Sequence, residues 1–126
     1  MNIDNAYPPE AQLENWRRTV RLDRKKNEVE VRDAYVLKKP VPVITLSLMT
    51  PCAVEQTAPG ELKLSGATAG FGSARVLFDG SSLKPVVEDI PLNDGRLSRE
   101  WGPHMHRILL RAEQPPARGT WVLRVV

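Results

Sequence analysis

The stretch WRRTVRLDRKKNEVEVRDAYVLKK, residues 16–39, decides the fold of this chain because its apolar side chains fall on alternating positions. In residues 16–23, one side of an extended chain carries Trp16, Val20 and Leu22, while arginine, threonine and aspartate occupy the other side. Residues 29–37 repeat the alternation after the polar group RKKNE. A period of two is typical of half-buried strands, so the stretch predicts a long β-hairpin.

Asp33 lies on the apolar side of this predicted hairpin, in step with Val29, Val31 and Tyr35. A carboxylate at such a position predicts either a β-bulge nearby or a buried carboxylate whose oxygens accept hydrogen bonds. The alternation alone leaves both alternatives open.

Short apolar runs continue to the C-terminus, separated by clusters of Pro, Gly, Asp and Ser that favour turns. They predict further strands at 43–50, 61–66, 74–80, 84–92, 104–113 and 120–126. The last two flank the turn-rich QPPARG and predict a closing hairpin, with 120–126 deep in the sheet because it is apolar on both faces apart from Arg124. Residues 91–102 offer Asn93 or Asp94 as a helix cap, but Gly95 limits the prediction to one helical turn at most.

About eight short strands without a long helix predict an all-β fold, an antiparallel β-sandwich or a closely related barrel. The length of 126 residues suits one domain with one core. Residues 1–15 are polar and contain Pro8 and Pro9, which predicts a linker or peripheral N-terminal segment. Residues 16–126 are predicted to form a single β-sandwich domain.

The composition argues against several classes of partner. No apolar run approaches the ~18 residues of a membrane span, and the N-terminus lacks the basic start and apolar centre of a secretory signal. The net charge of +3 is too small to indicate a nucleic-acid footprint. The single cysteine, Cys52, excludes an internal disulfide and predicts a small buried side chain. We therefore expect neither a membrane nor a nucleic-acid partner.

Both histidines of the chain occur in the pattern His-x-His at His104 and His106, on one side of a predicted strand. An open zinc site ordinarily takes three protein ligands, and the chain has no third histidine. Three carboxylates could complete such a site: Asp33, Glu88 and Asp89. Their spacing in the sequence does not favour any of them as a metal ligand. No serine stands in a Gly-x-Ser-x-Gly elbow, and Gly70-Phe71-Gly72 falls short of a dinucleotide-binding fingerprint. We predict no metal, no cofactor and no catalytic residue.

Aromatic and cationic side chains supply the candidate binding residues. Trp16 and Trp121 keep step with apolar neighbours and are predicted to lie in the core. Trp101 precedes Gly102-Pro103 and is predicted to cap the core, the alternative being that it faces a ligand. A cationic face for an acidic polysaccharide would use Trp101 with Arg17, Arg21, Arg99, Arg107 and Arg111. A solvated sheet face is the alternative explanation of these arginines.

Seven stretches, taken in order, resemble the C-terminal part of heparinase II/III-like proteins, a family of polysaccharide lyases and their relatives. They are YPPEAQLENWRRTVRLDR (7–24), VEVRDAYVLKKP (29–40), TLSLMTPCAVE (45–55), PGELKLSG (59–66), VEDIPLNDGRLSREWG (87–102), HRILLRAE (106–113) and GTWVLRVV (119–126). The resemblance rests on the ordered set, since no single stretch is a strong motif.

The resemblance implies a parent chain with a helical toroid, a large antiparallel sandwich and a final small β-domain like this one. It implies that the parent cleaves uronic-acid glycans by elimination, with a base that removes the C5 proton and an acid that protonates the leaving oxygen. The tyrosine and histidine with these roles belong to the preceding regions, so no catalytic residue is transferred here. The family's bacterial members generally meet their polymers in the periplasm or outside the cell.

Three hypotheses follow, each with its own structural expectation. A non-catalytic accessory domain, partnered by the upstream catalytic domains, should carry an uncovered apolar patch on its surface. An independent carbohydrate-binding module should expose Trp101 beside Arg99 or Arg107. A small metal-dependent enzyme should hold an ion at His104 and His106 with a carboxylate ligand.

Overall fold

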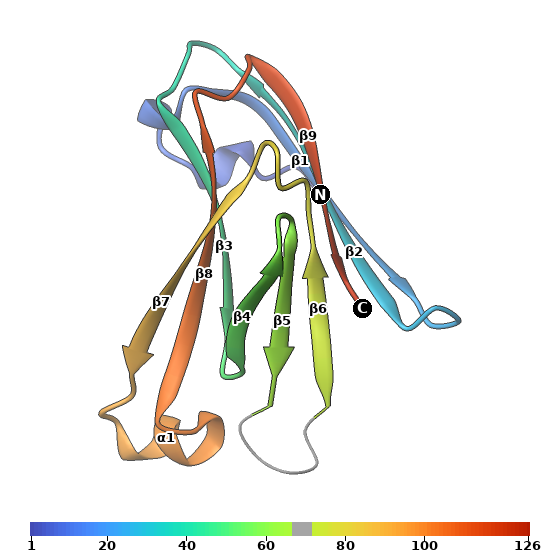
Figure 1. Cartoon of the computed structure of the whole chain (residues 1–126). Helices are drawn as coiled ribbons and strands as arrows, with labels where there is room; N and C mark the ends of the chain where they lie inside the picture. The colour runs from blue at the N-terminus through green and yellow to red at the C-terminus, as the bar shows by residue number, and fades with distance from the viewer. Residues whose placement is uncertain (67–71) are drawn as a thin grey trace.

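A computed structural model describes residues 1–66 and 72–126 of the chain. In these residues nine antiparallel strands form two sheets, which confirms the predicted all-β sandwich. The six-stranded sheet has the order β1 (Leu13–Asp23), β2 (Glu28–Leu37), β9 (Arg118–Val125), β6 (Ser73–Leu77), β5 (Glu61–Ser65) and β4 (Ala53–Ala58). The three-stranded sheet has the order β3 (Val43–Thr50), β8 (His104–Glu113) and β7 (Lys84–Pro91). Figure 1 shows the two sheets facing each other.

The predicted long hairpin is confirmed as β1 and β2, which pair continuously from Asn15↔Val36 to Asp23↔Glu28. Its turn is organised by Asp23, whose carboxylate accepts hydrogen bonds from the backbone N–H groups of Lys25 and Lys26, both at 3.1 Å. Asn27 completes the turn in the left-handed region, with φ 52°. Asparagine tolerates that region better than most residues, so the polar group between the strands is what lets the hairpin close.

Of the two alternatives predicted for Asp33, the structure has the buried carboxylate that accepts hydrogen bonds. No β-bulge lies beside it, because the pairing of β1 with β2 is unshifted around Asp33. Its Oδ1 accepts a hydrogen bond from Trp16 Nε1 at 2.7 Å and another from Arg18 Nε at 2.8 Å. Its Oδ2 accepts one from the Nη2 of Arg18 at 2.8 Å. Hydrogen bonding to Asp33 raises the pKa of the Arg18 guanidinium, since it favours the charged form.

The core lies between the sheets at the end of the hairpin that carries Asp33. Trp16 and Trp121 are both buried there, as predicted. Tyr35 packs between them, with ring centroids 5.8 Å from Trp16 and 4.6 Å from Trp121. Fully buried aliphatic side chains from both sheets and from the connection before β7 fill the rest of the core: Leu62, Val76, Leu83, Ile108 and Leu110.

The prediction of a closing hairpin at residues 104–126 is wrong. β8 pairs with β3 and β7 in one sheet, whereas β9 pairs with β2 and β6 in the other. Both edges of β8 are already occupied, so the chain crosses to the other sheet after Gln114, whose N–H extends the ladder of β8 with β3 by donating to Pro42 O at 2.8 Å. The interior position predicted for the last strand is confirmed, because β9 has a partner on each side.

In three further places the helices and strands of the structure differ from the predicted ones. The helix is longer than the one turn predicted, since α1 (Gly95–Trp101) has seven residues, with Asp94 as the N-cap that accepts from Arg96 N and Leu97 N. Strand β4 was not predicted. Cys52 is half-buried in the short turn before it. Residues 1–12 form a peripheral segment with two short 3-10 turns, η1 (Asp4–Ala6) and η2 (Pro9–Ala11), and β1 already begins at Leu13, inside the segment assigned to the linker.

The connection from β6 to β7 is tightened by Asp79, an exposed carboxylate with a pKa lowered to about 2. The lowering comes first from hydrogen bonds donated by the hydroxyl groups of Ser81 at 2.6 Å and Ser82 at 2.7 Å, and then from the Ser81 N–H at 2.9 Å. These bonds favour the ionised carboxyl. Their contribution to stability is therefore complete above the unfolded pKa of about 3.9 and is lost as the pH falls through the folded value.

We expect Ser81→Ala to raise the pKa of Asp79 toward its ordinary value, because it removes the strongest of these donors. The carboxyl resonance of Asp79, followed by NMR from acid to neutral pH, measures the pKa in both proteins. An unchanged titration curve in the variant would show that the hydroxyl does not set this pKa.

Candidate functional site

The distal half of the β1–β2 hairpin carries an uncovered apolar surface. Val20 is 61% exposed and Leu22 57% exposed, although both share the inner side of β1 with buried Trp16. Val31 lies directly opposite Val20, and Val29 directly opposite Leu22, so all four side chains share one face. We call Val20, Leu22, Val29 and Val31 the hairpin patch. The prediction that Val20 and Leu22 lie on the same side of the strand as Trp16 is confirmed, but the burial expected for both side chains is wrong.

The hairpin patch is uncovered because the two sheets differ in width. The three-stranded sheet faces β4, β5 and β6 and the proximal half of the hairpin, and the distal half projects away from it (Figure 1). Sheet pairing between β6 and β9 is short: Val76 pairs with Val125 and Leu77 with Arg124, and backbone hydrogen bonds between Arg75 and Val126 extend it by one residue. The three-stranded sheet covers the proximal part of β1, β2 and β9, where Trp16, Tyr35 and Trp121 are buried, and the inner face of the distal half of the hairpin is left without a second layer.

The outer face of the same hairpin is charged, and several of its charges are paired. Arg124 Nε lies 3.6 Å from Glu30 Oε2 and 3.9 Å from Glu28 Oε1, and Arg32 lies 3.4 Å from Glu30. The hairpin is thus amphipathic, with ionic contacts on the side that meets water. An apolar opposite side is the pattern of a sheet that packs against another layer.

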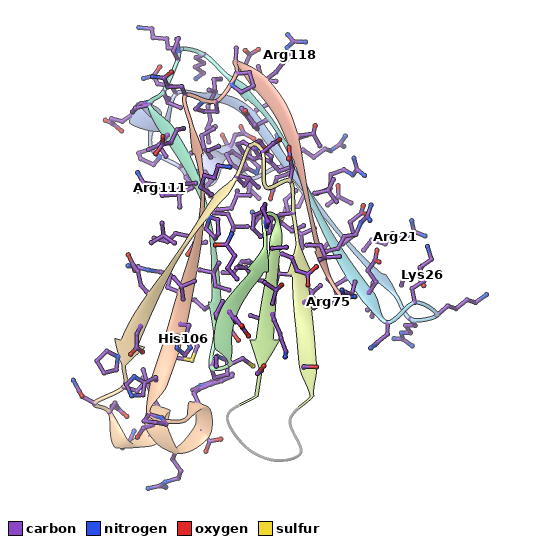
Figure 2. The ribbon with its side chains drawn as sticks, in the orientation of Figure 1. Arg21, Lys26, Arg75, His106, Arg111 and Arg118 are labelled. Atoms are coloured by element: carbon purple, nitrogen blue, oxygen red, sulfur yellow. The ribbon has the colours of Figure 1, made fainter. Side chains whose placement is uncertain are left out.

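The arginines predicted to form one cationic face do not share a face. Arg17 and Arg21 lie on the outer face of β1, opposite in direction to buried Trp16. Arg107 and Arg111 lie on the outer face of β8, in the other sheet. Figure 2 shows Arg21 and Arg111 on opposite sides of the molecule. All four are exposed, as the alternation predicted, but they give two separate surfaces.

Local acidic partners reduce the charge of these surfaces further. Arg107 Nε donates to Glu88 Oε2 at 2.7 Å, across the pairing of β8 with β7. On the hairpin, Glu30 lies opposite Arg21 in the strand register, and its carboxylate contacts Arg32 and Arg124. The solvated sheet face, the alternative explanation of the alternating arginines, fits these contacts better than a polyanion site.

Trp101 does not cap the core, which corrects the prediction. It is the last residue of α1 and is 52% exposed. Leu97, one turn earlier on the same helix, is also exposed. Arg99 lies between them on α1 and is exposed, so this end of the molecule presents an aromatic ring with a cation nearby in sequence. The exposure of Trp101 is what a carbohydrate-binding module requires.

The histidines point along the side of β8 that carries Ile108, as predicted. His104 Nδ1 lies 2.8 Å from Asp89 Oδ1, while the Nδ1 of half-buried His106 has no hydrogen-bond partner. Within residues 1–66 and 72–126, no three His, Cys, Asp or Glu side chains come close enough to hold a metal ion together. Gly70 and Phe71, of the glycine-rich stretch, lie outside the described residues.

No protein-family model and no curated protein sequence matches this chain. In the part of the chain that the structure describes, no helix is long and apolar enough to cross a membrane. The hairpin patch is the feature that sequence reasoning missed. Its signal was present in the alternation of Val20 and Leu22, but alternation reports which side chains share a face and not whether a second sheet covers that face.

Proposed function

We propose that this chain is the non-catalytic C-terminal accessory β-sandwich domain of a heparinase II/III-like polysaccharide lyase. In this proposal the parent acts on uronic-acid-containing glycans by β-elimination, in the periplasm or outside the cell. This domain packs against the catalytic part that precedes it. The observation that carries the proposal is the hairpin patch, an apolar sheet face of the kind that a neighbouring layer covers.

The tyrosines and histidines of the chain support a non-catalytic role. Burial raises the pKa of the Tyr35 hydroxyl, which opposes the ionisation that a tyrosine base needs. Tyr7 stacks on Trp16 at 6.1 Å between ring centroids, and His104 is paired with Asp89 on a different sheet. These groups come from separate parts of the sandwich, whereas elimination needs an acid and a base converging on one sugar ring.

The docking role predicts that Leu22→Asp weakens association with the catalytic region of a heparinase II/III-like lyase by about ten- to a hundredfold. That range corresponds to the about 1.5–3 kcal/mol gained when an exposed leucine side chain becomes buried. Isothermal titration of the 126-residue chain with the separately prepared catalytic region measures the dissociation constant. Leu97→Asp is the matched control, because Leu97 is similarly exposed but lies on α1, and its affinity should stay unchanged. Equal effects of the two substitutions would remove the hairpin patch from the interface.

The exposure of Trp101 favours a second candidate function, an independent module that binds acidic polysaccharide. This alternative places the sugar on the Trp101 ring with Arg99 and Arg107 as cations, so its affinity should fall as salt screens the ionic contacts. An amide NMR titration with sulfated and non-sulfated uronic-acid oligosaccharides, at low and physiological salt, tests it. Saturable shifts around Trp101 that persist at physiological salt would favour the module, and their absence favours the accessory domain.

A further inference from the structure

The outer face of the six-stranded sheet has a shallow depression of about 300 Å³ where β1, β2 and β9 run side by side. We call it the outer depression. Ala34 and Val36 of β2 form its floor with Gly119 of β9, and all three are half-buried. Because successive side chains of a strand point to opposite faces, Ala34 and Val36 point away from buried Tyr35. The outer depression therefore lies on the face opposite to the core and to the hairpin patch.

Four polar side chains stand around this floor, and all of them are exposed: Asn15 and Arg17 of β1, and Arg118 and Thr120 of β9. All but Arg17 line the depression itself. Arg17 and Thr120 flank Ala34 in the strand register, and the other two flank Val36. Directly opposite residues share a face, so the outer depression has one guanidinium group on each of its two long sides.

These two guanidinium groups are not neutralised by neighbouring side chains. Among residues 1–66 and 72–126, neither Arg17 nor Arg118 has a carboxylate within 4 Å. Arg17 lies opposite Ala34, whereas Arg21 on the same strand lies opposite Glu30. Neighbouring strands are about 5 Å apart, so β1 and β9 are about 10 Å apart across β2. The long side chains of the two arginines can therefore reach one anion that lies over β2.

The donors and acceptors of the outer depression suit a hydroxylated carboxylate. A guanidinium group donates two parallel hydrogen bonds to a carboxylate, which a neutral ligand does not use. The Asn15 amide, whose nitrogen lies 3.5 Å from Asn2 Oδ1, and the Thr120 hydroxyl can both accept hydrogen bonds from hydroxyl groups. The flat floor between them leaves room for a ring. A ring that carries one carboxylate and several hydroxyl groups is a uronic acid.

We propose that the outer depression binds one uronic acid residue of an acidic glycan. Its carboxylate lies between Arg17 and Arg118, and its hydroxyl groups contact Asn15 and Thr120. The identity of the glycan rests on the proposed function, which gives the parent a uronic-acid substrate. The site is separate from Trp101, which lies on α1 beside the other sheet. The accessory domain then holds the glycan on one face of the sheet and docks through the hairpin patch on the other.

An amide NMR titration of the 126-residue chain with a 1,4-linked uronic-acid tetrasaccharide, at physiological salt, tests the proposal. We expect saturable shifts at the amides of Ala34, Val36 and Thr120, with those of Trp101 unchanged. Shifts that are absent from the outer depression, or that occur only at low salt, would overturn the proposal, because exposed charges attract any anion when screening is weak.

Arg17→Gln and Arg118→Gln should each weaken this binding about five- to tenfold, because each removes a pair of charge-assisted hydrogen bonds. Arg21→Gln is the matched control. Arg21 is exposed on the same face of β1 but lies beyond the outer depression, so the affinity should stay within about twofold. An equal loss in all three variants would overturn the proposal, since only the net charge of the sheet face would then matter.

Two further ligands separate a carboxylated sugar from other sources of the same chemistry. A neutral glucose tetrasaccharide lacks the carboxylates, and a tetraglutamate peptide lacks the hydroxylated ring. We expect both to bind about tenfold more weakly than the uronic-acid tetrasaccharide. Equal affinity for either one would overturn the proposal. Failure here leaves the proposed function standing if Leu22→Asp still weakens binding to the catalytic region, because the hairpin patch lies on the other face of the sheet.

Discussion

Replacing Asp33 with alanine is expected to lower the free energy of unfolding by about 3–5 kcal/mol, the usual cost of removing one partner of a buried ion pair. The substitution leaves the indole N–H of Trp16 and the partly buried guanidinium of Arg18 without their acceptor. A buried donor without a partner loses its hydration and gains nothing in return. Urea unfolding followed by tryptophan fluorescence measures the change, because Trp16 reports directly on this network.

Glu30→Ala is the matched control for this prediction. Glu30 lies on the same strand as Asp33 but on the outer face, where its contacts with Arg32 and Arg124 are 3.4 and 3.6 Å long. Ion pairs near the surface contribute little, so the loss should stay below about 1 kcal/mol. A similar cost for both substitutions would contradict the view that Asp33 is the ionic centre of the core.

Leu110→Ala should cost about 3–5 kcal/mol, the range for a buried leucine whose cavity does not collapse. Leu110 is fully buried on β8, between the two sheets. Leu22→Ala should cost less than about 0.5 kcal/mol, because the side chain at this position already meets solvent in the isolated domain. Chemical unfolding of both variants under identical conditions gives the comparison.

This contrast also tests whether the hairpin patch is open in solution. A large loss of stability in Leu22→Ala would mean that something covers the patch in the isolated chain. A second copy of the chain would be the first occupant to examine, through the dependence of stability on protein concentration.

Local patterns predicted the hairpin and its buried carboxylate. The alternation in residues 16–23 and 29–37 was sufficient to predict the pair of strands, although Arg18 and Asp33 interrupt it. For the acidic residue on the apolar side it left two alternatives, a bulge or a buried carboxylate that accepts hydrogen bonds. The strand from Ala53 to Ala58 could not be found this way, because Val54 is its one large apolar side chain. The length of the helix was underestimated. The N-cap at Asp94 stabilises the first turn and outweighs the low helix propensity of Gly95.

Long-range arrangement was the part that the sequence did not reveal. The runs at 104–113 and 118–125 are neighbours in sequence, yet they lie in different sheets, because β3 and β7 occupy both edges of β8. The same limit applies to the candidate site. The alternation of the arginines correctly predicted exposure, but only the sheet topology shows that Arg17 and Arg107 lie on opposite outer faces.

Docking through the hairpin patch can be tested by an amide NMR spectrum of the labelled 126-residue chain, recorded as the unlabelled catalytic region of a heparinase II/III-like lyase is added. Docking should produce shifts and broadening at the hairpin patch, centred on Val20 and Leu22, and leave the amides of α1 unchanged. An unchanged spectrum at a concentration of the catalytic region well above that of the chain would contradict it. So would perturbations centred on Trp101 and Arg99 that leave the hairpin unaffected.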